Sequence, residues 1–132
     1  MSGSRLEVPT RWTFDAGAEV ARARAYGRCE VCAMRPDTQS HHRQPRGMGG
    51  VSGVGLVVNS PANLVRICQV CHDRAESYRD RARRVGLLVP RPTDPATVPV
   101  RLRTVNGTGW YLLLESGDYH WQDLPEDWSA CA

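Results

Sequence analysis

The sequence predicts a small α+β domain in which bound metal stabilises a modest hydrophobic core. Helices are predicted over 15–26, DAGAEVARARAY, and over about 70–84, and strands over 38–43, 56–58, 99–105 and 110–115. Two CxxC pairs account for four of the five cysteines. The 132 residues suffice for one domain, but they include a single Phe, 12 Gly and 9 Pro, so the core needs additional support.

The chain is expected to divide into three parts. Residues 1–14 form an irregular lead, 15–89 the main domain, and 90–132 an extension with the proline-rich linker PRPTDPATVP and a β-hairpin. In the main domain, Asp15 is the expected cap of the first helix and Gly27 its end. Ser60 and Pro61 predict a short helical turn, and the Asn-Gly pair at 106–107 suits the tight turn of the hairpin.

The charge of the chain favours a polyanionic partner. The net charge is +3, the pI is about 8.8, and all 17 basic residues are arginine. The planar arginine fork suits phosphate, but a GC-rich genome would produce the same bias. The N-terminus, MSGSRLEVPT, lacks the apolar segment of a secretory signal, and no run approaches the ~20 apolar residues of a membrane span, so we expect a cytoplasmic protein without membrane contact.

The paired cysteines predict a structural zinc site. In a reducing cytosol, two CxxC pairs indicate metal ligands in preference to disulfides. Four thiolates fill a tetrahedral zinc shell and leave no position for water, which makes such a site structural. A redox CxxC or cysteines packed in a core are the alternatives. The expected ligands are Cys29, Cys32, Cys68 and Cys71, and Cys131 stands apart.

Two adjacent histidines, His41 and His42, fall within a predicted strand. Neighbouring side chains of a strand point to opposite faces, so the two imidazoles should have different roles. One could bind a metal ion that offsets charge on a phosphate, while the other accepts a proton from an attacking water. Taken singly, Asn63 would be a turn residue and His72 an exposed helix residue.

Together these residues resemble the HNH endonuclease family. The segments GRCEVC, SHHRQPRGMGG and NSPANLVRICQVCH contain, in order, the first cysteine pair, two histidines, an asparagine, and the second pair followed by histidine. The pattern is similar to that of small, often phage-encoded HNH nucleases with a zinc-binding ββα-metal core, over roughly residues 20–90. The resemblance implies an HNH nuclease domain at 15–89, in which an N-terminal helix precedes the ββα-metal core, followed by a C-terminal β-hairpin extension.

The resemblance also implies roles for single residues. His42 would be the general base, His41 and His72 would bind a catalytic divalent ion, and Asn63 would fix the loop carrying His42 through a backbone hydrogen bond. Many members have a further histidine where this sequence has Glu76. A carboxylate there could complete the ion's shell and favour Mg²⁺ or Mn²⁺. Alternatively, Glu76 pairs with Arg79 or Arg83 on a solvated helix face.

Arginines near these residues are candidates for DNA contact. Beside the glycines, Arg43 and Arg46 could hold phosphates, while Arg79 and Arg83 could follow a DNA backbone. An ordinary exposed loop and a solvated helix face are the respective alternatives. The expected function is hydrolysis of DNA phosphodiester bonds with low sequence specificity, with duplex DNA and, by the resemblance, phage terminase as partners. The alternative is a non-catalytic, zinc-stabilised DNA-binding accessory module.

Overall fold

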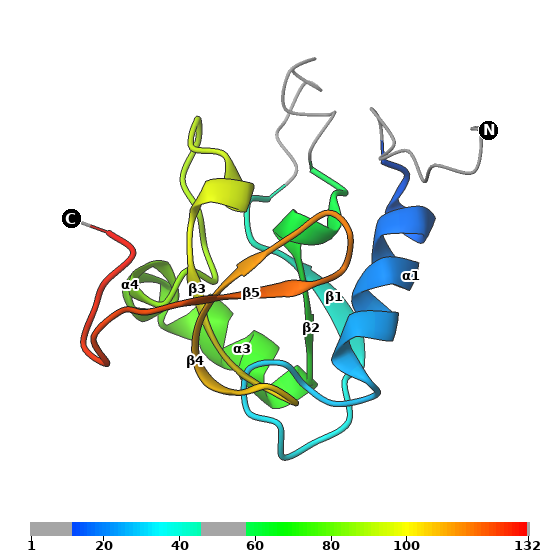
Figure 1. Ribbon diagram of the computed structural model, residues 1–132, viewed down its shortest axis with the longest axis horizontal. Coiled ribbons are helices and arrows are strands. Elements are labelled where there is room, and N and C mark those ends of the chain that lie inside the picture. The colour runs from blue at the N-terminus through cyan, green and yellow to red at the C-terminus, as the bar shows by residue number, and fades with distance from the viewer. Residues whose placement is uncertain (1–11, 46–57, 132) are drawn as a thin grey trace.

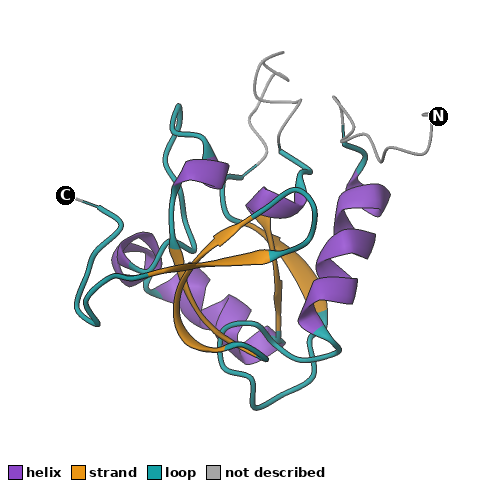
Figure 2. Ribbon diagram, in the orientation of Figure 1, coloured by secondary structure: helices purple, strands orange, loops and turns teal. Residues whose placement is uncertain are grey.

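The computed structural model describes residues 12–45 and 58–131 and confirms an α+β fold (Figure 1). The strands form two small antiparallel sheets, one of two strands and one of three, and the helices lie beside them (Figure 2). None of the described helices has the length and apolar character needed to cross a bilayer. In chain order the elements are α1 Phe14–Ala25, β1 Gln39–His42, the 3-10 turn η1 Pro61–Asn63, β2 Leu64–Ile67, α3 Gln69–Ser77, α4 Arg79–Arg84, the 3-10 turn η2 Pro95–Thr97, β3 Val100–Thr104, β4 Gly107–Leu113 and β5 Tyr119–Gln122.

A strand-strand-helix unit occupies the middle of the chain. Strand β1 pairs antiparallel with β2, so that His41 lies opposite Val65 and His42 opposite Leu64. Helix α3 follows β2 directly, with Cys68 as its N-cap. On the other side of this unit, α1 packs against β2 (Figure 1).

The position of the second strand differs from the prediction. The partner of β1 is Leu64–Ile67, whereas Val58, the described residue of the predicted strand 56–58, lies in a turn. Both segments contain short apolar runs, and such runs alone do not identify the pairing strand. The 3-10 turn at Pro61–Asn63 is as predicted, with the Ser60 side chain accepting from the amide of Ala62.

The helices also depart from the prediction in detail. The first is capped by Thr13, whose Oγ1 accepts from the amide of Ala16, and not by Asp15. The predicted helix 70–84 is interrupted at Tyr78, where φ is −122° and ψ is 68°. At this break, Tyr78 is 63% exposed.

The C-terminal extension forms a three-stranded sheet in the order β3-β4-β5. The predicted hairpin is confirmed as β3 and β4, and β5 adds a strand that the sequence did not suggest. Residues from this sheet share one hydrophobic cluster with α3, α4 and β2. The cluster contains Val65, Ala75, Ala82, Leu87, Leu88, Val100, Leu102, Tyr111 and Leu113.

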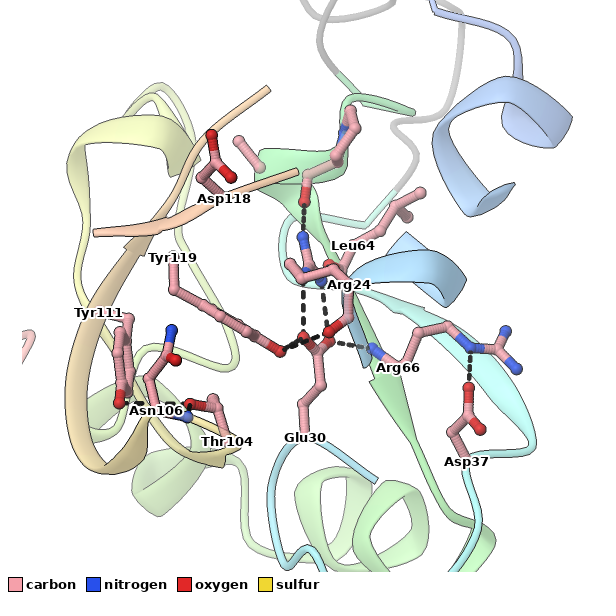
Figure 3. A network of polar contacts seen from close by, with 12 residues as sticks. Arg24, Glu30, Asp37, Leu64, Arg66, Thr104, Asn106, Tyr111, Asp118 and Tyr119 are labelled. Atoms are coloured by element: carbon pink, nitrogen blue, oxygen red, sulfur yellow. Dashed lines mark hydrogen bonds and ion pairs between the residues drawn. The ribbon is translucent and has the colours of Figure 1, made fainter. Parts of the chain in front are cut away.

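A buried polar network also joins the C-terminal sheet to the rest of the fold (Figure 3). The Glu30 carboxylate accepts from Arg24 at 2.7 and 2.8 Å, from the amide of Arg66 at 2.7 Å, and from the Tyr119 hydroxyl. Burial by itself lowers the pKa of Arg24, but Glu30 raises it above its ordinary value. Burial and then Glu30 raise the pKa of Tyr119, so its hydroxyl remains a donor.

Candidate functional site

Four cysteine side chains converge where the loop that follows α1 meets the start of α3. The Sγ atoms of Cys29, Cys32, Cys68 and Cys71 all lie within 4.8 Å of one another. The Cys32 and Cys68 sulfurs are 4.0 Å apart, close to the ~3.8 Å edge of a tetrahedron with Zn–S bonds of ~2.3 Å. All five cysteines are free thiols. The cluster therefore fits a structural zinc site, as predicted.

Backbone geometry around the cluster prepares the sulfurs for a cation. The amide of Met34 points at Cys32 Sγ and the amide of Cys71 at Cys68 Sγ, each at 3.4 Å. Burial would raise the pKa of Cys32, but backbone donation from Met34 and Arg35 lowers it to about 6. Burial, followed by the neighbouring Cys29, raises the pKa of Cys71. A divalent cation at the centre of the cluster would offset the repulsion between neighbouring thiolates, because it stabilises the charged form of all four sulfurs.

A second cluster is formed by the imidazoles of His41 and His72 and the carboxylate of Glu76. One ligand atom from each lies within 4.8 Å of the others. His41 comes from β1, whereas His72 and Glu76 are one turn apart on α3. The two imidazole rings are 5.6 Å apart with an interplanar angle of 71°. The structure therefore brings together the three residues expected around a catalytic ion.

The buried His41 is oriented by a main-chain acceptor. Its Nε2 lies 2.8 Å from the carbonyl oxygen of Leu87. Because a carbonyl only accepts, Nε2 carries the hydrogen and the lone pair is on Nδ1. Burial lowers the pKa of His41, which favours the neutral ring that metal binding requires. A ligating histidine held through its other nitrogen is the usual arrangement in metal sites.

Glu76 is in reach of two kinds of partner. It is exposed and lies near both histidines, and its Oε1 is also 3.6 Å from Arg79 NH1. Both side chains of this pair are about half exposed, at 48% and 51%, so the ion pair contributes little stability. The carboxylate can therefore turn to a cation without a large loss, and the two interpretations of Glu76 from the sequence both have geometric support.

His42 occupies a different environment from His41, its neighbour on β1. Its Nε2 lies 3.1 Å from Asn59 Oδ1, and its ring stacks on Phe14 at 5.7 Å and 28°. With Nε2 donating to an oxygen, the lone pair of His42 is on Nδ1. Asn59 and Phe14 contact a predicted site residue but were not singled out in the sequence, since their proximity depends on the packing of α1.

Asn63 is buried and uses its side chain to hold the main chain. Its Oδ1 accepts from the amide of Gln44 at 2.8 Å, and its Nδ2 donates to the carbonyls of Gln44 at 3.0 Å and Val58 at 2.8 Å. Gln44 is two residues beyond His42, so Asn63 fixes the backbone where β1 ends. An effect on the orientation of His42 stays a prediction.

The expectation that Arg43 contacts DNA is wrong. Its side chain is fully buried, and its guanidinium donates to the carbonyls of four residues at 2.6–3.0 Å: Ala62, Gly86, Pro95 and Val98. Burial lowers its pKa to about 9. All but one of its N–H donors are engaged by main-chain oxygens, so Arg43 binds three separate segments of the chain and cannot reach a phosphate. Arg46 lies outside the described residues.

Arg79 and Arg83 are exposed on α4 and line a groove of about 290 Å³ that Arg91 also borders. Arg83 pairs with Asp80 at 2.9 Å. The groove adjoins the second cluster, because Arg79 in its wall lies 3.6 Å from Oε1 of Glu76. Arg91 was not predicted as a site residue, since it stands in a proline-rich segment whose composition indicates only a linker.

Fold and clusters define a small α+β protein with a four-cysteine centre and a separate His-His-Glu group. Comparison of the chain with protein-family models, curated proteins and solved structures found no match. The function of the protein is therefore inferred from the geometry of the two clusters.

Proposed function

We propose that the protein is a metal-dependent endonuclease that hydrolyses DNA phosphodiester bonds. The observation that supports this proposal best is the convergence of His41, His72 and Glu76 beside a strand that presents His42 in a different environment. Two imidazoles and one carboxylate suit a divalent ion that keeps open positions for phosphate and water. The order strand, strand, helix agrees with the ββα-metal core that the sequence resembles.

In this proposal, each side chain has one task. His41, His72 and Glu76 would hold the ion, and the carbonyl of Leu87 would keep His41 in the correct tautomer. When bound, a Mg²⁺ or Mn²⁺ ion would supply Lewis acidity at the phosphate and at the leaving 3′ oxygen.

The attacking water would be activated by His42. Nδ1 of His42 would take a proton from the water as its oxygen bonds to phosphorus and the bond to the 3′ oxygen breaks. The products would be a 5′-phosphate and a 3′-hydroxyl. Asn59 would keep the lone pair on Nδ1 by accepting from Nε2, and Asn63 would hold the backbone just beyond the base.

The four-cysteine cluster would hold a structural zinc in this enzyme. It fixes Cys68 at the N-cap of α3, and α3 supplies His72 and Glu76. The zinc would thus set the position of the helix that carries two of the three ligands of the catalytic ion.

Duplex DNA would lie along the groove that Arg79, Arg83 and Arg91 line. Since phosphate contacts release counterions, replacing one of these arginines should lower the salt dependence of DNA binding by about one unit of slope.

A supercoiled-plasmid nicking assay with added Mg²⁺ or Mn²⁺ tests the proposal. The variant His42→Ala should nick about 10²- to 10⁴-fold more slowly, and the matched variant His120→Ala, at an exposed histidine in β5, should nick at the wild-type rate. Glu76→Gln should raise the divalent-ion concentration needed for half-maximal nicking. If a folded, zinc-loaded wild type binds DNA but nicks it with neither ion, the protein is instead an accessory DNA-binding module.

A further inference from the structure

A cavity separate from the His41-His72-Glu76 cluster opens on another face of α3, beside Cys71 of the four-cysteine cluster. Its volume is about 130 Å³, and its wall includes Cys71, Arg74 and Ala75 of α3 and Tyr78 at the C-cap of this helix. These residues recur at helical spacing, and His72 and Glu76 lie roughly a third of a turn away from them. The cavity therefore does not belong to the candidate catalytic site.

The floor of the cavity is apolar. It is formed largely by side chains of the main hydrophobic cluster that remain accessible at this point, with Val31 and Val85 at the edge. The residues of the floor that come from that cluster are Ala75, Ala82, Leu87 and Leu102. A hollow that leads directly to the core offers a place for one apolar side chain.

The rim of the cavity carries four arginines. Arg74 and Arg81 come from α3 and α4, and Arg101 and Arg103 from β3. Within the described part of the chain, Arg74, Arg81 and Arg103 form no ion pair. Such a concentration of uncompensated positive charge around an apolar hollow attracts an anionic ligand.

Arg101 adds evidence for an acidic ligand. Its NH2 pairs with Glu126 of the acidic C-terminal segment, and the amide of Ala130 donates to the carbonyl of Arg84 at 2.8 Å. The chain's own carboxylate thus already occupies one edge of the rim. Nε of Arg101 is buried without a hydrogen-bond partner among the described residues, which is costly unless an acceptor is supplied.

The size of the cavity limits its occupant. Pockets for small molecules and cofactors usually measure about 300–1,000 Å³, and this cavity is well below that range. A DNA duplex presents phosphates on its outside but no protruding apolar group that could fill the hollow. A peptide can present both, because an apolar residue may be flanked by aspartates or glutamates.

We propose that this cavity is a docking site for an acidic segment of a partner protein. One apolar side chain of that segment fills the hollow, and flanking carboxylates pair with Arg74, Arg81 and Arg103. The buried anchor supplies affinity and the arginines select acidic sequences. This proposal does not depend on the nuclease proposal, because the two sites lie on different faces of α3.

Fluorescence anisotropy with labelled synthetic peptides tests the docking site on the full chain. The first peptide has one leucine between two aspartates on either side, and the second has serine in place of the leucine. We expect the leucine peptide to bind about 10- to 100-fold more tightly, because only leucine transfers an apolar side chain out of water. Equal affinity for the two peptides, or binding of neither, overturns the proposal.

Charge-reversal variants locate the binding. Arg81→Glu and Arg103→Glu should each weaken binding of the leucine peptide by about tenfold or more, whereas Arg22→Glu, at an exposed position of α1, should leave it unchanged. All three positions are exposed, and circular dichroism will show that the variants fold. Unchanged binding in both rim variants overturns the assignment. The assignment is also overturned if an oligothymidine displaces the leucine peptide and Arg103→Glu weakens the binding of both ligands equally. In that case the cavity binds nucleic acid.

Discussion

Replacing the buried Arg43 should destabilise the fold without weakening DNA contact. In Arg43→Lys the charge remains, but three ammonium donors cannot reproduce a planar fork that reaches four carbonyls. Losing two charged hydrogen bonds costs about 1.5–2.5 kcal/mol each, so we expect a loss of about 3–5 kcal/mol in the free energy of unfolding. This is a large share of the ~5–15 kcal/mol typical of a domain.

Urea denaturation of Arg43→Lys and of Arg79→Lys, an exposed control, measures this loss. With an m-value of about 2 kcal/mol/M, the midpoint of Arg43→Lys should fall by about 1.5–2.5 M, and that of Arg79→Lys by less than about 0.3 M. At temperatures where both variants are folded, Arg43→Lys should bind DNA with the wild-type salt slope. A normal midpoint together with a reduced salt slope would refute the structural role of Arg43.

Three further outcomes are expected. The purified protein should contain one tightly held zinc by elemental analysis, and Cys71→Ser should lose zinc and unfold while Cys131→Ser, at an exposed cysteine, should behave as wild type. Tyr119→Phe removes a buried hydrogen bond to a carboxylate and should cost about 1–3 kcal/mol in thermal or urea unfolding, whereas Tyr26→Phe, at a largely exposed ring, should cost almost nothing. Burial lowers the pKa of His41 in the folded chain. Between this lowered pKa and about 6.5, the ordinary pKa of a histidine in the unfolded chain, the unfolded chain binds a proton that the folded chain does not bind. The free energy of unfolding should therefore rise with pH across this window. His41→Gln, measured by urea denaturation at several pH values without added divalent ions, should show a shallower rise; an identical pH dependence would contradict the assignment.

The parts of the structure that the sequence predicted well depend on short-range patterns. Each CxxC pair is a local unit, so the four-cysteine cluster followed from spacing alone. The i, i+4 relation of His72 and Glu76 similarly placed both on one face of α3. The hairpin of β3 and β4 was marked by its turn, where Gly107 adopts a φ of +114°.

The features that the sequence did not predict depend on long-range contacts. Arg43 is buried because four carbonyls from three separate segments surround it, and nothing in the neighbouring sequence indicates those acceptors. The break at Tyr78 has neither glycine nor proline to mark it. Strand β2 is buried at every position, including Arg66, which pairs with Asp37 at 2.6 Å. Because a charged residue stands within it, the sequence pattern did not indicate a buried strand.

The bonds of Asn63 to Gln44 and Val58 make the glycine-rich stretch between these residues suitable for protein engineering. One amide side chain clamps both ends of the segment, so the anchor points stay fixed whatever sequence joins them. Each doubling in length of a segment that joins two fixed ends costs only about 0.6 kcal/mol. An affinity tag or a foreign DNA-reading peptide could therefore be grafted into residues 46–57 while the anchored framework keeps its geometry.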